Sequence, residues 1–389
     1  MKKRKKNFDK EIFKLEKIFY GKSKRLHDPI FFGNEIKYLT KCIKSSFVSS
    51  VGNYVSEFEK KISSITGAKY SVATSSGTAA LHLALKYLKV DKNDEILMPS
   101  FTYVATANAV KYCDAAINFL DIENDQLGIC PIKLEKYLQK ISIKKGKYTY
   151  NKFNKKKIKA IIVVHVYGFP CKIIEIKKIC KKYNIILIED AAEAIGSRFK
   201  KKHLGVFGEI GILSFNGNKT VTAGSGGAII CNSKKIYDSI YHLSTQAKVK
   251  KRYDHIHDEV GYNYRMNNLS AAVGCAQIEN LKKIISLKRK NFKKYFDIFK
   301  NTKNVEIVKE PKNCISNYWL IIIKFKEIND KKIFLKKLQK KNYGMRYTWR
   351  PLHLLKIFKG YNSDKLTNCE SFFKHSLNLP SSPVLSFKK

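Results

Sequence analysis

The stretch Ile185-Ile-Leu-Ile-Glu-Asp-Ala-Ala-Glu-Ala-Ile-Gly196 decides the fold class. Its apolar run is short and unbroken, which is typical of a strand that is covered on both faces. Two acids, Glu189 and Asp190, close the run, and small residues follow them. A helical pattern precedes the stretch over residues 173–182, so helix and strand alternate here, as they do around parallel sheets.

The same alternation extends along the chain in both directions. We predict helices near residues 77–88, 106–112 and 173–182. We predict strands at residues 70–74, 95–98, 116–120, 159–166, 185–189, 212–215 and 228–231. The sequence therefore predicts an α/β fold in which helices sandwich a mostly parallel central sheet, with ligand sites beyond the carboxyl ends of the strands.

The regions around this core complete the expected organisation. Residues 1–30 are predicted to form a Lys-rich N-terminal arm, residues 31–275 a large domain, and residues 276–389 a smaller C-terminal α+β domain. Within these regions we expect an exposed polar loop at 143–157, one long helix over 267–299 and a strand at 318–325.

Composition excludes several classes of protein. With 389 residues, 44% of them hydrophobic, the chain can bury a large core, which excludes intrinsic disorder. No apolar run is long enough to span a bilayer. Charged residues follow the basic start Met1-Lys-Lys-Arg-Lys-Lys6 where a leader would be apolar, so we expect a cytoplasmic protein. The nine dispersed cysteines form no CxxC pair, which predicts free thiols and no metal site.

The formal net charge of +44 raises the alternative of a protein that binds nucleic acid or anionic membranes. Only eight of the 76 basic residues are arginines, the residue type that recognises bases and phosphates through paired hydrogen bonds. The lysines are spread along the chain, and Ile, Asn, Tyr and Phe are also abundant, as in proteins from AT-rich genomes. We therefore predict no nucleic-acid and no membrane partner, and a basic surface that attracts a small polyanionic substrate.

Two predicted loops carry residues that suit a ligand. Ser75-Ser-Gly-Thr78 joins a strand to a helix start, where free N–H groups and the helix dipole can hold a phosphate. The simpler alternative is a helix N-cap. Asp190 ends a buried strand and is costly to bury without a partner. The ring N–H⁺ of a bound pyridinium is one candidate partner, and the start of the next helix is the other.

Two further loops hold a lysine and an aromatic motif. Leu213-Ser-Phe-Asn-Gly-Asn-Lys219 places Lys219 in a glycine-rich turn after a buried strand, where a desolvated amine becomes nucleophilic. Spacing alone does not single Lys219 out among the many lysines. Gly261-Tyr-Asn-Tyr-Arg-Met-Asn267 either lines a site or packs a domain junction. The motifs of P-loop NTPases, HExxH zinc proteases and GxSxG hydrolases are not in the sequence.

In this order, and with the loop Pro99-Ser-Phe-Thr-Tyr-Val-Ala-Thr-Ala-Asn108, the motifs resemble those of the sugar-nucleotide aminotransferases of the DegT/DnrJ/StrS type. The resemblance covers about residues 27–389 and implies a fold-type-I enzyme that uses pyridoxal 5′-phosphate (PLP). A narrower resemblance is to the subgroup that makes 4-amino sugars for bacillosamine and legionaminic-type acids. It rests on Phe32-Gly-Asn-Glu35, Phe47-Val-Ser-Ser-Val-Gly-Asn-Tyr-Val55 and Ser214-Phe-Asn-Gly-Asn-Lys219.

The resemblance implies a role for each matching residue. Lys219 would carry PLP covalently and move protons between cofactor and substrate, and Asp190 would keep the ring nitrogen protonated. Tyr103 would stack on the ring, and Glu193 would lie near the cofactor oxygen. The phosphate would be bound by Thr78, Ala79, Ser214 and, from the neighbouring subunit of a homodimer, Asn263. The candidates for substrate contact, with surface salt pairing as their alternative, are Asn317, Tyr318, Arg346, Arg350 and His353.

The implied reaction moves an amino group from L-glutamate, through pyridoxamine phosphate, to C4 of a nucleotide-linked 4-keto-6-deoxy sugar. The narrower resemblance favours UDP-2-acetamido-2,6-dideoxy-hexos-4-ulose and a place in surface-polysaccharide or nonulosonic-acid biosynthesis. The alternative is GDP-4-keto-6-deoxymannose, the substrate of perosamine synthases. Family members that dehydrate deoxysugars carry His where this chain has Lys219, which argues against dehydration. A PLP-binding regulatory homologue without turnover is the other alternative.

Overall fold

The computed structural model describes residues 8–22, 24–124, 126–249 and 254–387. The basic start of the chain, Met1-Lys-Lys-Arg-Lys-Lys6, lies outside these ranges. Among the described helices, none combines the length and the apolar character needed to cross a membrane. The nine cysteines are free, and all but Cys314 are buried, which confirms the prediction of free thiols.

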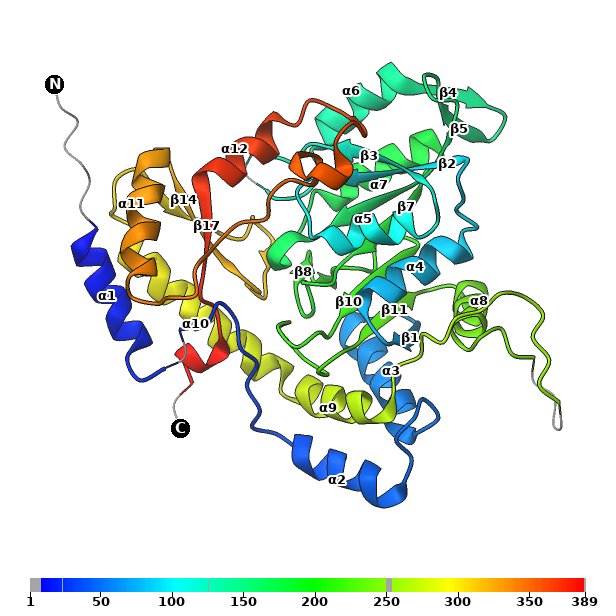
Figure 1. Cartoon of the computed structure of the whole chain (residues 1–389), viewed down its shortest axis with the longest axis horizontal. Helices are drawn as coiled ribbons and strands as arrows, with labels where there is room; N and C mark the ends of the chain where they lie inside the picture. Colours follow the sequence, from blue (N-terminus) through cyan, green and yellow to red (C-terminus); the bar gives the residue numbers. More distant parts are fainter. Residues whose placement is uncertain (1–7, 23, 125, 250–253, 388–389) are drawn as a thin grey trace.

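A ten-stranded sheet forms the larger part of the molecule, and Figure 1 shows most of its strands in cyan and green. Its main strands are β1 (Tyr70–Thr74), β2 (Asp94–Pro99), β3 (Ala116–Leu120), β6 (Lys157–Val164), β7 (Ile186–Asp190), β10 (Ile210–Ser214), β11 (Gly227–Cys231) and β16 (Asn362–Ser363). They lie in the order β1-β11-β10-β7-β6-β2-β3-β16. Only β11 runs antiparallel to its neighbours in this series, so the predicted mostly parallel sheet is confirmed.

Successive strand residues point to opposite sides of this sheet. Both sides are apolar, so helices cover both faces. In β6, Ile162 and Val164 belong to the apolar cluster that includes α4, α5 and α8, whereas Ile161 and Val163 belong to the cluster that includes α3, α6, α7 and α9. These helices are α3 (Asn53–Thr66), α4 (Gly77–Tyr87), α5 (Val104–Lys111), α6 (Pro131–Ile141), α7 (Ile173–Tyr183), α8 (Lys234–Ser244) and α9 (Asn268–Glu279).

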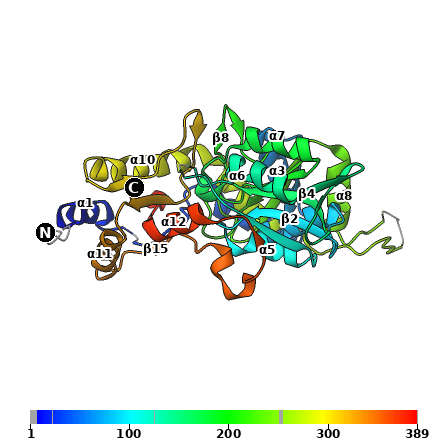
Figure 2. The same ribbon diagram turned by 90° about the horizontal axis from the view of Figure 1, so that it is seen from above.

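A smaller antiparallel sheet lies beside the large one, as both views show (Figures 1 and 2). Its strands, in spatial order, are β12 (Val305–Ile307), β14 (Ile321–Phe325), β17 (Ser376–Leu379) and β15 (Arg346–Tyr347). The associated helices are α10 (Leu281–Phe299), α11 (Ile328–Gln339) and α12 (Thr367–His375). Short strands β8 (Arg198–Phe199), β9 (Lys202–His203) and β13 (Cys314–Ile315) form a third sheet.

Two N-terminal helices flank these sheets, α1 (Asp9–Phe19) and α2 (Glu35–Ser45). Helix α1, from the segment expected as an arm, buries one apolar face. The ring of Phe8 contacts Phe334 at 5.3 Å, and the ring of Phe19 contacts Tyr343 at 4.6 Å. The domain bounds 31–275 and 276–389 remain a prediction. The segment expected as a separate arm, however, packs through α1 with the small sheet and its helices.

The polar stretch 143–157 is not the loop that we expected. It contains a hairpin of β4 (Ser142–Lys145) and β5 (Tyr148–Asn151), and β5 pairs with β6. Asn151 turns inward and donates to the buried carboxylate of Glu95 at 2.9 Å. The same carboxylate accepts hydrogen bonds from three other amides, those of Asn118, Asn154 and Asn362. Because the Glu95 carboxylate and its amide partners are all polar, this stretch of sequence lacks the apolar pattern from which a strand is predicted.

Several boundaries differ from the sequence expectation by one or two residues, and two larger differences have a clear local cause. The helix expected over 267–299 is broken at Asn280 into α9 and α10, where the Asn280 side chain donates to Ala276 O at 3.1 Å and competes with the helix ladder. The strand expected from residue 318 begins at Ile321, since Tyr318 has a φ of 47° that a strand does not accept.

Candidate active site

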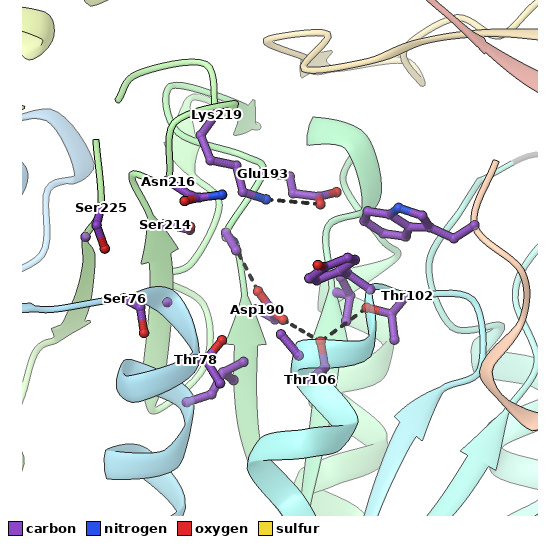
Figure 3. Close-up of a pocket in the computed structure, with 18 residues that line it drawn as sticks. Ser76, Thr78, Thr102, Thr106, Asp190, Glu193, Ser214, Asn216, Lys219 and Ser225 are labelled. Atoms are coloured by element: carbon purple, nitrogen blue, oxygen red, sulfur yellow. Dashed lines mark hydrogen bonds and ion pairs between the residues drawn. The ribbon is translucent and has the colours of Figure 1, made fainter. Parts of the chain in front are cut away.

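A cavity of about 270 Å³ lies where the carboxyl ends of β1, β2, β7 and β10 meet. These strands point the same way, so the loops that follow them converge at one edge of the sheet. Figure 3 shows side chains from all four loops turned into this space.

The loop between β1 and α4 forms one wall of the cavity. Ser76 Oγ accepts the N–H of Ala79 at 3.1 Å, so it is a helix N-cap. The N–H groups of the first helical turn, at Gly77 and Thr78, have no intrahelical acceptor and border the cavity. A Cβ on Gly77 would lie 3.0 Å from Ser214 Cβ, so glycine allows the Ser214 side chain to approach the helix start. The loop is both an N-cap and an anion cradle, and the two sequence alternatives are compatible.

Asp190 ends β7 at the floor of the cavity. Its Oδ2 accepts from Thr106 Oγ1 at 2.8 Å, and its Oδ1 accepts from the N–H of Ala192 at 3.1 Å. Burial raises the pKa of Asp190, although these hydrogen bonds and the charge of Lys219 act in the opposite direction. A cation placed in the cavity against Asp190 would offset this desolvation.

The neighbouring acid has a different role. Glu189 is completely buried, contacts His165 at 2.8 Å, and accepts N–H groups from Gly205, Phe207 and Gly208. Of the two acids that close the strand, Glu189 is therefore satisfied by the protein and Asp190 faces the cavity.

Lys219 enters the cavity from the loop after β10. Its Nζ lies 3.3 Å from Glu193 Oε1, and its side chain is 11% exposed. Burial raises the pKa of Glu193 to about 7, partly offset by Lys219 and by the N–H of Tyr167, which donates to Glu193 Oε2 at 2.7 Å. The two groups therefore form a buried acid–base pair at the mouth of the cavity (Figure 3).

Aromatic rings form the remaining wall. Tyr103, at the start of α5, is 56% exposed and lies 5.9 Å from Trp349, measured between ring centroids. Trp349 packs on Tyr167 at 4.6 Å, and the Nζ of Lys219 lies 4.1 Å from the ring of Trp319. These rings enclose the lysine and give a planar ligand a surface to stack on.

A second cavity of about 670 Å³ opens from the first. Both are lined by Tyr103, Glu193, Asn216, Lys219 and Trp349, so they meet at the lysine. The second cavity is also lined by residues of the N-terminal segment and the small sheet, among them Arg25, His27, Asp28, Trp319, Arg346 and Asn378.

The structure brings most of the predicted cofactor residues together. The first cavity is lined by Thr78, Tyr103, Asp190, Glu193, Ser214 and Lys219. Ala79 is not among the lining residues, and its N–H donates to the Ser76 cap. Asn263 is exposed, and it pairs with Thr245 outside the cavity of this chain. Its neighbours Tyr262 and Tyr264 stack at 5.1 Å and pack on His82, as the packing alternative expects.

Of the five predicted substrate residues, only Arg346 lines a cavity described here. Asn317 is buried and uses its amide to bind the carbonyl oxygens of Glu193 and Ile195. Tyr318 is buried and stacks on Phe292. The other two make contacts away from the cavities: Arg350 with the ring of Phe373, and His353 with Ser100 and Glu370.

Sequence reasoning missed several lining residues, including Thr106, Asn216, Trp319, Trp349 and His27. One signal was available for two of them. The chain has only two tryptophans, and both lie at this site.

The residue types fit PLP. The helix start offers an anion cradle for a phosphate, Asp190 offers a buried carboxylate for a ring N–H⁺, and Lys219 offers an amine for an aldehyde. The glycine at residue 77 leaves room that a Cβ would fill.

Comparisons with known proteins agree with this assignment. The model of the DegT/DnrJ/EryC1/StrS aminotransferase family matches residues 31–389. GDP-perosamine synthase of Escherichia coli O157:H7 is 36% identical over 93% of this chain and 94% of its own length. The UDP-4-amino-4,6-dideoxy-N-acetyl-beta-L-altrosamine transaminase of Campylobacter jejuni serotype O:23/36 is 31% identical over 91% of both chains. A solved DegT DnrJ EryC1 StrS aminotransferase from Brucella abortus superposes with a TM-score of 0.80 and 25% identity, over 90% of both chains. This likeness confirms the predicted fold class.

Proposed function

Since the chain belongs to the DegT/DnrJ/EryC1/StrS aminotransferase family and is a PLP-dependent sugar-nucleotide aminotransferase, we propose that it aminates C4 of a GDP-linked 4-keto-6-deoxy sugar. L-Glutamate is the proposed amino donor. The donor carbon is oxidised from amine to ketone and yields 2-oxoglutarate, while C4 of the sugar is reduced from ketone to amine. The exchange therefore needs no other oxidant or reductant.

The choice of GDP takes the alternative of the sequence analysis over its main expectation. The motifs at residues 32–35, 47–55 and 214–219 favoured a UDP-linked 2-acetamido sugar. Over nearly the whole chain, however, two GDP-perosamine synthases are 36% identical and a third, from Caulobacter vibrioides, is 30% identical. The two UDP-sugar transaminases are 31% and 30% identical. The proposal follows the longer comparison, because it uses nearly the whole chain and not three short stretches.

The observation that carries the proposal is the pair of joined cavities. The smaller one has the residues for the cofactor, and the larger one opens from it at Lys219. Arg25 and Arg346 line the larger cavity, and guanidinium groups suit a diphosphate. A nucleotide sugar that enters here would present its sugar end to the lysine.

The residues of the chain then divide the chemistry among them. PLP, when bound, supplies a ring that withdraws electrons from the reacting carbon. Asp190, held by Thr106 and Ala192, keeps a proton on the ring nitrogen. Lys219 Nζ acts as the base that removes the proton from the donor carbon and as the acid that delivers one to C4 of the sugar.

Glu193 assists Lys219 as a neighbouring acid. Burial raises the pKa of Glu193 to about 7 and its Oε1 lies 3.3 Å from Nζ, so it is placed to exchange a proton with the lysine. The rings of Tyr103 and Trp349 shield this exchange from water.

The homodimer, the contribution of Asn263 from a neighbouring subunit, and the cytoplasmic location remain predictions. A dimer would explain why Asn263 is exposed although it belongs to a site motif.

The proposal is tested by offering the purified holoenzyme GDP- and UDP-linked 4-keto-6-deoxy sugars separately, with glutamate, and identifying products by mass spectrometry. We expect amination of the GDP sugar. Lys219→Ala should abolish both turnover and the visible absorbance of the bound cofactor, whereas the exposed Lys248→Ala should change neither. Amination of the UDP-linked 2-acetamido sugar alone would refute the GDP proposal and support the UDP-linked substrate that the sequence motifs favoured. No product from either sugar would refute the substrate class.

A further inference from the structure

His27 lies on an N-terminal segment that crosses the second cavity. The backbone of this segment is held on both sides of His27. Leu26 O accepts the N–H of Ser381 at 2.8 Å, and the N–H of Asp28 donates to Ser382 Oγ at 2.8 Å. Two residues before Leu26, Lys24 O accepts the N–H of Gly344 at 2.7 Å. The position of the His27 backbone is therefore determined by the small sheet and the chain that follows it.

The imidazole of His27 has no comparable support. It is 8% exposed and lines the second cavity, yet neither ring nitrogen has a hydrogen-bond partner in the part of the chain that the structure describes. Buried polar groups are normally paired, so this ring is an exception that calls for an explanation. Residues that lower the stability of the free protein are characteristic of ligand sites.

The surroundings of His27 keep its ring neutral. Burial lowers the pKa of His27 well below its ordinary value, and the positive charges of Lys288 and Lys219 lower it further. A neutral imidazole donates from one nitrogen and accepts at the other. That pairing suits a hydroxyl group, which also donates and accepts, better than it suits a phosphate.

The positions of the charged residues along the second cavity indicate how a substrate would be oriented in it. Arg25, whose side chain is 83% exposed, and Arg346, which is also exposed, lie toward solvent. Lys219 lies where the two cavities join. A diphosphate would bind near the arginines, and the reacting carbon must reach the lysine. The buried imidazole of His27 lines the same cavity and is close enough to Lys219 to be affected by its charge.

We propose that His27 binds the sugar ring of the nucleotide-linked substrate, through hydrogen bonds between its neutral imidazole and ring hydroxyl groups. The inference rests on the proposed function and extends it, because it names a residue that recognises the sugar and not the nucleotide. On this proposal, the two ring nitrogens of His27 have hydrogen-bond partners only when the substrate is bound.

The test compares His27→Phe, which removes both hydrogen-bonding nitrogens, with His27→Gln, which keeps one donor and one acceptor. A matched control is His82→Phe, because His82 is equally buried but its Nδ1 contacts Tyr264 OH at 3.3 Å outside both cavities. For each holoenzyme we would measure KM for the GDP-linked keto sugar, Kd for GDP alone, the rate of the half-reaction with glutamate, and Tm.

We expect His27→Phe to raise KM for the sugar nucleotide by about tenfold to hundredfold, the effect of losing buried hydrogen bonds to a ligand. The Kd for GDP and the glutamate half-reaction should stay within about twofold of the wild type, and His27→Gln should recover much of the loss. Tm should not fall, since an unpaired imidazole is replaced by an apolar ring. His82→Phe should instead lower Tm and leave KM unchanged.

Three results would overturn the inference. They are an unchanged KM in His27→Phe, an equal loss of affinity for GDP and for the sugar nucleotide, and a fall in Tm or a failure to fold that His27→Gln shares. If the wild type aminates neither sugar nucleotide, the proposed function itself fails. That outcome is recognised before any His27 variant is compared.

Discussion

The carboxyl group of Glu193 supports a quantitative prediction for Glu193→Gln. Burial raises its pKa from an ordinary value of 4.5 to about 7. Between these values the folded protein holds a proton that the unfolded chain has released. The stability associated with that proton is complete below pH 4.5 and is lost as the pH rises to 7. The difference of about 2.5 units corresponds to about 3 kcal/mol.

Glutamine cannot ionise, so Glu193→Gln should not show this loss. We expect the variant and the wild type to have similar free energies of unfolding near pH 4.5. The variant should become more stable by up to about 3 kcal/mol at pH 8. The assay is urea unfolding of the cofactor-free proteins at several pH values, since a cofactor attached to Lys219 would change the charge that Glu193 meets.

The control is Glu306→Gln, which makes the same substitution at an exposed carboxylate and is measured at the same pH values. A constant difference for Glu193→Gln between pH 5 and 8 would refute the reasoning, because it would mean that Glu193 ionises as easily in the fold as in the unfolded chain. A wild type that gains stability over the variant as the pH rises would show that the attraction of Lys219 exceeds the cost of burial.

Three further variants test the cofactor site. Asp190→Asn should retain bound cofactor, seen by its absorbance, but lose orders of magnitude in kcat; a nearly normal rate would contradict the ring-nitrogen role. Thr106→Val removes the 2.8 Å hydrogen bond to Asp190 and should lower kcat by about tenfold with little change in KM for glutamate. Gly77→Ala places a Cβ 3.0 Å from Ser214 Cβ and should weaken cofactor affinity by about tenfold in a titration; unchanged affinity would mean that the phosphate binds elsewhere.

The part of the site that the sequence predicts lies on the strands of the large sheet. Asp190 and Ser214 end strands whose apolar runs are plain in the sequence, and Lys219 follows closely after one of them. Parallel strands bring their carboxyl ends to one edge, so the order of the motifs is enough to bring these residues together. The resemblance to a family then supplied what spacing could not, the choice of Lys219 among many lysines.

The part that the sequence does not predict comes from the small sheet and the N-terminal segment. His27 and Trp349 are far from the motifs along the chain, and they meet Lys219 only through tertiary packing. The same packing decides where the predicted substrate residues lie, and it leaves Arg346 in the wall of the second cavity. Asn317 and Tyr318 carry suitable side chains, but the backbone turns at Tyr318 and directs both into the protein interior.

The placement of the two tryptophans has a consequence for observing this protein. Because Trp319 and Trp349 are the only tryptophans in the chain and both line the second cavity, the tryptophan emission of the protein arises entirely beside this cavity. Trp319 donates its indole N–H to Asn218 O at 2.7 Å, and the ring of Trp349 packs on the ring of Tyr167 with 4.6 Å between centroids, so each indole has a defined contact. Intrinsic fluorescence, excited selectively at the indoles, therefore reports directly when a ligand enters or leaves, without any attached label.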